Sequence, residues 1–154
     1  MFREMRRKDR QIYDVLVTEI LEKGEYGVIS IIGENGYPYG VPVNYAYHQD
    51  SIYFHCAKTG HKLDAIRKDC RVSFCVVTDT ELLPADFSTK YKSVIAFGSA
   101  KEIDGDEKKR ALLKLIDKYS PGFKNEGRDY VDKEHAGTTI VKITIEHITG
   151  KARL

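Results

Sequence analysis

Cysteine is scarce in this sequence, and long apolar runs are missing from it. The 154 residues contain three cysteines, an odd number that argues against a disulfide framework and for free thiols in a reducing compartment. No stretch approaches the roughly 20 apolar residues that a membrane span needs. The N-terminal charges are not followed by the apolar stretch of a signal peptide. We therefore expect a cytoplasmic protein without membrane association.

Excess charge of either sign is also small. The sequence has 25 Lys and Arg against 23 Asp and Glu, a formal net charge of +2. This bias is weaker than that of a typical nucleic-acid-binding protein, so no nucleic-acid partner is expected. Residues 1–12 form a basic N-terminal arm, interpreted as packing over its own fold or over a partner subunit. A small nucleic-acid-binding barrel that uses this arm is the less favoured alternative.

Common cofactor and catalytic motifs are missing as well. The sequence has no Gly-rich dinucleotide fingerprint, P-loop, nucleophile elbow or zinc-protease motif. Any organic cofactor would therefore be held by a non-Rossmann scaffold. The histidines and cysteines lack zinc-like spacing, so no metal site is expected.

Short predicted strands rich in β-branched residues dominate the sequence. The length suits a single domain over residues 1–154. The first three strands are predicted to form an antiparallel meander, because Asn35-Gly36 is a strong hairpin signal. Apolar periodicity predicts helices over 14–23, 61–68, 106–119 and 128–134. Strands are predicted over 25–33, 37–47, 52–56, 71–77, 92–103 and 138–148. Six strands with few helices predict a mainly β fold, an antiparallel barrel with peripheral helices.

The segment 54–62, FHCAKTGHK, concentrates polar chemistry between a strand and a helix. Thr59 is a candidate helix cap, Gly60 marks the turn, and His61 and Lys62 fall in the first helical turn. Cations are unfavourable at this positive end of the helix dipole unless an anion binds there, with Lys58 adding charge. An anion cradle and a surface turn that tolerates lysines are equally compatible with the pattern.

Cys56 and Cys75 lie inside apolar strands. A cysteine in such a strand usually behaves as a small hydrophobic residue. A reactive thiol is therefore the less favoured interpretation of both.

The strand YGVPVNY gives a second, independent signal. Gly40, Pro42 and Asn44 share one face, and proline cannot donate to a sheet ladder. The pattern predicts a flat surface with an interrupted ladder, on which a planar aromatic ligand could lie. A plain edge strand is the alternative.

Four stretches together resemble the nitroimidazole-resistance (Nim) family of the pyridoxamine 5′-phosphate oxidase-like flavoproteins. They are MFREMRRKDR, GEYGVISIIGENGYPYGVPVNYAY, IYFHCAKTGHKLDAIRKDCRVSFCVV and ITIEHITGKAR. The resemblance implies a six-stranded antiparallel split β-barrel and a homodimer, with FMN in each of two clefts between the subunits.

The resemblance also implies the site residues. Those beside the flavin ring are Val41, Pro42, Val43 and Asn44. Those around the ribityl phosphate or the ring edge are His55, Ala57, Lys58, His61 and Lys62, with Gly60 at the turn. The C-terminal residues Lys151 and Arg153 would reach the partner subunit's flavin.

The function implied is reduction of a nitro-aromatic or similar small electrophile, with a nicotinamide electron donor. His55 is the candidate catalytic residue, because an imidazole can supply a proton as the substrate accepts electrons; orienting FMN is its alternative role. The chain lacks the C-terminal Arg-Leu-Ser-Pro-type signature of true pyridoxamine-phosphate oxidases, which disfavours that oxidase activity. An FMN-binding or sensing module without turnover is the other alternative.

Overall fold

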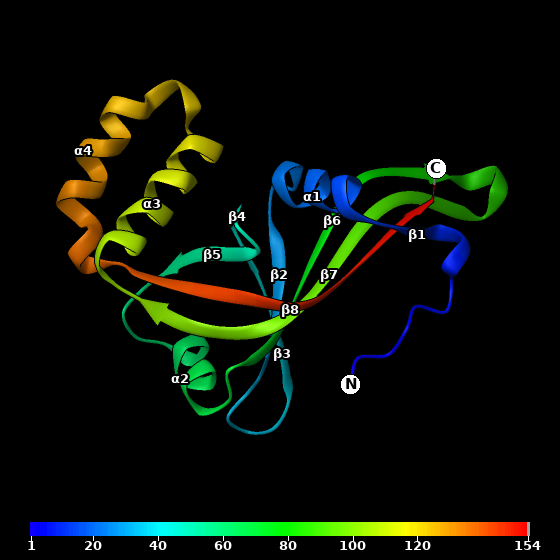
Figure 1. Cartoon of the computed structure of the whole chain (residues 1–154), viewed down its shortest axis with the longest axis horizontal. Coiled ribbons are helices and arrows are strands. Elements are labelled where there is room, and N and C mark those ends of the chain that lie inside the picture. The colour runs from blue at the N-terminus through cyan, green and yellow to red at the C-terminus, as the bar shows by residue number, and fades with distance from the viewer. Residues whose placement is uncertain (154) are drawn as a thin grey trace.

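The computed structural model describes residues 1–153, which are organised around one antiparallel sheet flanked by helices (Figure 1). The strands are β1 (Gln11–Ile12), β2 (Gly27–Ile32), β3 (Pro38–Val43), β4 (Ala46–His48), β5 (Ser51–Cys56), β6 (Arg71–Leu83), β7 (Ser88–Ile103) and β8 (Thr139–Arg153). The helices are α1 (Asp14–Lys23), α2 (His61–Lys68), α3 (Gly105–Tyr119) and α4 (Lys124–Glu134), with short 3₁₀ turns η1 (Lys8–Arg10), η2 (Pro84–Asp86), η3 (Pro121–Phe123) and η4 (His135–Gly137). Among these described helices, none has the length and apolar character that crossing a membrane requires.

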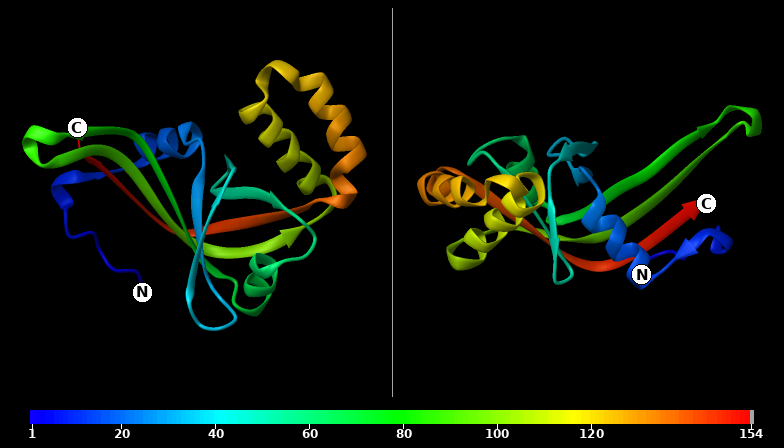
Figure 2. Two further views of the ribbon diagram at one scale, coloured as in Figure 1. Left: turned by 180° about the vertical axis from the view of Figure 1, so that it is seen from behind. Right: turned by 90° about the horizontal axis from the view of Figure 1, so that it is seen from above.

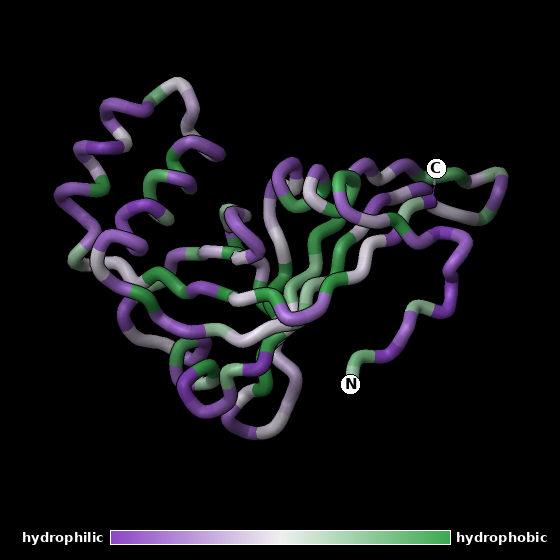
Figure 3. The backbone as a smooth tube through the Cα atoms, viewed as in Figure 1, coloured by the Kyte–Doolittle hydropathy of each residue, from purple (hydrophilic) through white to green (hydrophobic). Residues whose placement is uncertain are grey.

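The sheet runs in the order β3-β2-β6-β7-β8-β5-β4, and β1 pairs with β8. The hairpin β6–β7 and the end of β8 extend away from α3 and α4 (Figure 2). The helices α3 and α4 are inserted between β7 and β8, two strands that pair with each other along most of their length. These two helices are largely hydrophilic, whereas apolar residues concentrate in the central strands (Figure 3).

All four predicted helices are confirmed, and every predicted strand is found, but the predicted meander is wrong. The expected strand over 37–47 is divided into β3, which pairs with β2, and β4, which pairs with β5. Within residues 1–153, β3 and β4 do not pair with each other, so they are the two ends of an open sheet. The observed strand count is therefore eight, not six.

Tyr45 explains the division of this strand. Its side chain is fully buried, and its hydroxyl donates a hydrogen bond to the Leu21 carbonyl at 2.5 Å. Its backbone N–H donates to the hydroxyl of Tyr119 at 3.0 Å instead of to a strand. These contacts with α1 and α3 take the chain out of the ladder, so β4 begins at the other end of the sheet.

The two sides of the central sheet differ. One side carries the main core, which includes Ile29, Phe74, Val94 and Val141. On the other side, register places residues from β3, β2, β6, β7 and β8 in two rows, none of them buried and none with an acidic, lysine or arginine side chain. We call this the outer face; its rows are Pro42, Val28, Cys75, Ile95 and Thr149, and Gly40, Ser30, Ser73, Phe97 and His147.

The β-bulge between Phe97 and Gly98 provides a test of the fold. A Cβ at Gly98 would lie 2.1 Å from the Thr144 carbonyl oxygen, so both backbones would have to move. We expect Gly98→Ala to lower the free energy of unfolding by about 1–3 kcal/mol, the usual cost of overpacking. Urea denaturation measures this change. Gly137→Ala is the matched control, because a Cβ there meets nothing within 4 Å. Equal midpoints for the two variants would contradict the close approach at the bulge.

Candidate functional site

The first turn of α2 lies against the edge strand β3. The rings of Tyr39 and His61 stack, with centroids 4.4 Å apart and planes 18° from parallel. The same histidine also approaches Gly33 at the end of β2, where an added Cβ would lie 3.6 Å from its Nε2. The strand motif YGVPVNY and the segment FHCAKTGHK, which gave independent signals in the sequence, are therefore adjacent in space (Figure 1).

The helix α2 begins at His61, as predicted, but the predicted Thr59 cap is wrong. The residue before the helix is Gly60, at φ 142°, a conformation that favours glycine. No side chain in the described part of the chain caps this end. The first-turn N–H groups are thus left without a side-chain acceptor, at the end where the helix dipole favours an anion.

The two lysines predicted at the anion cradle differ in their surroundings. Lys62 is partly buried, and its Nζ lies 5.8 Å from the centroid of the Phe54 ring. Lys58 is exposed in the loop and lines a cavity of about 610 Å³ that also includes Arg67 and His135. Lys62 is therefore held close to the helix start, whereas Lys58 also faces the region of α3 and α4.

The predicted ring-binding segment 41–44 alternates between the two sides of the sheet. The side chains of Val41 and Val43 pack against the main core, whereas Pro42 and Asn44 are exposed. A ligand on the outer side can therefore meet the side chains of Pro42 and Asn44 but not those of Val41 and Val43. Pro42 lies in an edge strand, one of the alternatives that the sequence left open, because β3 ends the sheet.

His55 and Ala57 lie at the end of β5 and in the loop that follows it, and both are exposed. His55 is opposite Ile140 of β8 and has no side-chain hydrogen bond to another residue in 1–153. The neighbouring Cys56 is half-buried and packs against the core, and burial raises the pKa of its thiol. Burial raises the pKa of Cys75 in the same way. Both cysteines are thus poorly suited to act as nucleophiles.

Lys151 and Arg153 lie near the end of β8, at the far end of the molecule from α2 (Figures 1 and 2). Between the β3 edge and β8 there are four strand-to-strand spacings, about 19 Å along the sheet. The structure therefore does not bring these two residues together with the β3–α2 site within one chain.

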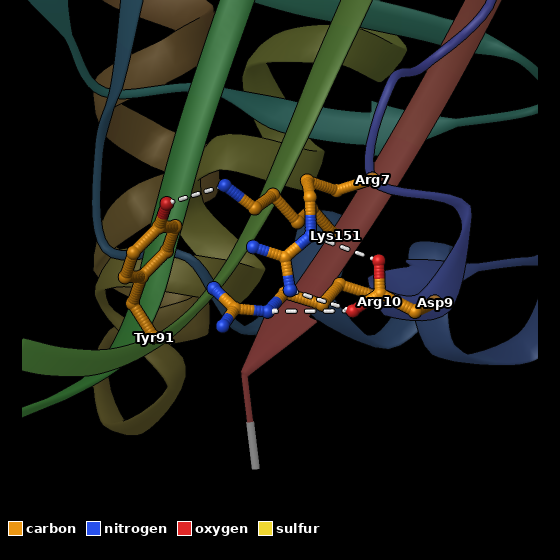
Figure 4. Close-up of polar contacts among 5 residues, drawn as sticks. All are labelled: Arg7, Asp9, Arg10, Tyr91 and Lys151. Atoms are coloured by element: carbon orange, nitrogen blue, oxygen red, sulfur yellow. Dashed lines mark hydrogen bonds and ion pairs between the residues drawn. The ribbon is translucent and has the colours of Figure 1, made fainter.

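The N-terminal arm lies beside this C-terminal strand. Lys151 Nζ donates to the Tyr91 hydroxyl at 2.9 Å, and Arg7 makes a two-bond contact with Asp9 at 2.9 and 2.6 Å (Figure 4). The hydrogen bond from Arg7 lowers the pKa of Asp9 to about 2. At the start of the arm, Phe2 stacks on His147 of the outer face with centroids 4.7 Å apart. The arm thus packs on its own chain.

No group of three or more His, Cys, Asp or Glu side chains within residues 1–153 is arranged to hold a metal ion.

The sequence profile of the family described as pyridoxamine 5′-phosphate oxidase matches residues 16–152. The chain belongs to this family. No curated protein sequence gives a significant match.

Several solved structures share the fold of this chain. A 5-nitroimidazole antibiotic resistance protein candidate from Bacteroides thetaiotaomicron is 21% identical, with a TM-score of 0.75 over 92% of this chain and 85% of that chain. The flavocytochrome Anf3 from Azotobacter vinelandii is 22% identical, with a TM-score of 0.83 over 98% and 72% of the two chains. An FAD- and haem-binding protein from Mycobacterium smegmatis is 21% identical, with a TM-score of 0.81 over 93% and 73%.

Identities this low show a shared fold, and they confirm the predicted mainly β, split-barrel class. The resemblance stated from the sequence is confirmed at the level of the pyridoxamine 5′-phosphate oxidase family. Sequence reasoning missed Tyr39, whose stacking on His61 joins the two motifs. Its place on the same side of the strand as Val41 and Val43 was visible, but its contact across the fold was not.

Proposed function

We propose that this protein is a homodimeric, FMN-dependent oxidoreductase that reduces nitro-aromatic compounds or similar small electrophiles. The observation that carries the proposal is the contact between the edge strand β3 and the first turn of α2. It puts a candidate surface for a planar ring beside a candidate site for a phosphate. Structural relatives described as a flavocytochrome and as an FAD- and haem-binding protein support a flavin as the ligand.

The phosphate would bind at the start of α2. The N–H groups of the first turn, the helix dipole and Lys62 all favour an anion there. His61 is held in place by its stacking on Tyr39 and would present its ring to the same end. Gly60 keeps this approach open, because a Cβ at that position would meet no atom of residues 1–153 within 4 Å.

The flavin ring would lie along β3. An edge strand has main-chain N–H and C=O groups that no neighbouring strand uses, and these can pair with the polar edge of a flavin. The unpaired main-chain groups of β3, together with the exposed Pro42 and Asn44, would bind the ring, while Val41 and Val43 would anchor the strand on the core. The exposed His55 would then either orient the flavin or supply a proton to the substrate.

A second copy of the chain would complete the site. The outer face crosses five strands and carries no Asp, Glu, Lys or Arg, so the part of it that Phe2 of the arm does not cover suits burial against an identical surface. Lys151 and Arg153 project from the opposite end of the sheet, so a partner could place them over a flavin that its own chain cannot cover. The bound flavin would supply the redox chemistry, with a nicotinamide as the electron donor, while the chain binds, orients and shields it.

The purified protein tests this proposal through its visible spectrum. We expect flavin absorbance as purified or after addition of FMN, with weaker binding of FAD and haem. Steady-state assays with NADH or NADPH and a nitro-aromatic acceptor should then show turnover. Tight FMN binding without turnover on any donor would instead support the sensing module. A protein that remains colourless with FMN would contradict the proposal, and salt-dependent oligonucleotide binding would favour the nucleic-acid alternative.

A further inference from the structure

A cavity of about 310 Å³ lies between α3, the strands β5 and β8, and the turn that joins β4 to β5. Arg110, Ala111 and Lys114 line it from the helix, and Ser51 and Lys142 line it from the sheet. It shares no lining residue with β3 or α2, so it is independent of the proposed flavin site. Its volume is at the lower end of the range for small-molecule sites, about 300–1,000 Å³.

The glutamate in this cavity is already neutralised. Lys142 Nζ donates to Glu107 Oε1 at 2.6 Å, and the Tyr53 hydroxyl donates to the same oxygen at 3.1 Å. The hydrogen bond from Lys142 lowers the pKa of Glu107, which keeps the carboxylate ionised. This acceptor is therefore occupied by the protein's own groups and offers little to a cationic ligand.

Two cations in the lining are not neutralised. Arg110 and Lys114 are four residues apart on α3, and within residues 1–153 neither forms an ion pair. The other acid of the lining, Asp117, lies 3.8 Å from Lys124. Since both acids have a lysine partner, the charge that remains for a ligand is positive.

A buried hydroxyl also faces this cavity with little else to bind. Ser51 is 4% exposed; its Oγ lies 3.4 Å from the Gln49 carbonyl, which is long for an O–H···O bond, and its side chain also interacts with Tyr53. Gln49 and Asp50 of the adjoining turn both have positive φ, 46° and 54°. This is the type I′ geometry that a two-residue hairpin loop favours, so the turn holds Ser51 in a fixed position at the start of β5.

We propose that this cavity binds a small organic carboxylate with an apolar body. Arg110, Lys114 and the Ser51 hydroxyl would donate to the carboxylate. Ala111 and Leu113, with the ring of Tyr53, would contact the apolar part. The excess of donors over free acceptors selects the anion, and the apolar lining selects an organic acid over inorganic phosphate.

Benzoate is a suitable probe, and ¹H–¹⁵N NMR of the full-length protein with its cofactor as purified is a suitable measurement. We expect benzoate to give saturable shifts of the Ser51, Ala111 and Lys142 amides. Benzyl alcohol, which lacks the charge, should bind at least about tenfold more weakly, the usual loss for one charge-assisted hydrogen bond. Inorganic phosphate should also bind at least about tenfold more weakly, because it has no ring to bury against the apolar lining. The absence of saturable shifts at these amides, or equal binding of benzyl alcohol or phosphate, would overturn the proposal.

Variants on α3 test the cation directly. Arg110→Gln should weaken benzoate binding about tenfold or more. Lys109→Gln is the matched control, because Lys109 is exposed on the same helix but does not line the cavity. If both variants lost the same benzoate affinity, the anion would be attracted by the general charge of the helix, and the proposed carboxylate site would be overturned. Neither variant should change FMN binding, so the result is separate from that of the proposed function.

Discussion

Replacing Lys62 with glutamine should weaken FMN binding by roughly 10- to 100-fold. The substitution removes one charge-assisted contact to the phosphate, worth about 1.5–3 kcal/mol, and leaves the helix start intact. The centroid of the Phe54 ring lies 5.8 Å from Lys62 Nζ, a distance at which a cation–π contact is weak, so little folding energy is lost with the charge. Titration of the apoprotein with FMN, followed by flavin fluorescence, measures the change.

Lys68→Gln is the matched control for this result. Lys68 lies in the last turn of the same helix, where its Nζ donates to the Glu34 carbonyl at 3.0 Å. It carries the same charge but lies at the end where the helix dipole repels an anion. FMN affinity should therefore stay within about twofold of the unsubstituted protein. If both variants lost the same affinity, the phosphate would not lie at the start of α2.

Replacing His55 with alanine should lower kcat by about 100-fold or more, while FMN affinity changes by less than about tenfold. Removing a general acid usually costs 10²- to 10⁴-fold in rate. Since His55 is exposed and has no side-chain hydrogen bond within residues 1–153, the variant should fold normally. Steady-state kinetics with a nitro-aromatic acceptor, combined with FMN titration, separates the two effects.

His55→Asn distinguishes the two roles of this residue. Asparagine can donate a hydrogen bond to the flavin but cannot transfer a proton. If His55 is the acid, the asparagine variant should be as slow as the alanine variant, and the pH dependence of kcat should change in both. A larger loss of FMN affinity than of turnover, with recovery in His55→Asn, would show that His55 only orients the cofactor.

The elements of this fold were predictable because they depend on local pattern. The helices 14–23 and 61–68 have apolar residues at helical spacing, and the structure gives both with these bounds. The division of the strand over 37–47 was not predictable, because Tyr45 continues the alternation of the valines before it. What removes it from the ladder is contact with Leu21 and Tyr119, which are distant in sequence.

The site was predictable in its parts but not in its arrangement. The sequence named His61 and Lys62 as first-turn cations, and they lie there. It could not show that Tyr39 would meet His61, because that contact depends on the order of strands. The flavin roles of all these residues, including Lys151 and Arg153, stay predictions until a bound cofactor is measured.

The position of α3 and α4 between two paired strands has a consequence for how this chain can change. Strands β7 and β8 are paired up to Ile103 and Ile140, so residues 104–138 are a long loop of a hairpin whose strands already meet. The entropy of closing a loop grows only slowly with its length, by about 0.6 kcal/mol for each doubling. The connection of the helical pair to the strands can therefore vary in length with little effect on strand pairing. The side of α3 that packs on the sheet is less free to change, because Ala111 and Leu115 are buried against it and Tyr119 supports Tyr45. New binding specificity could evolve most freely on the exposed side of α3 and α4.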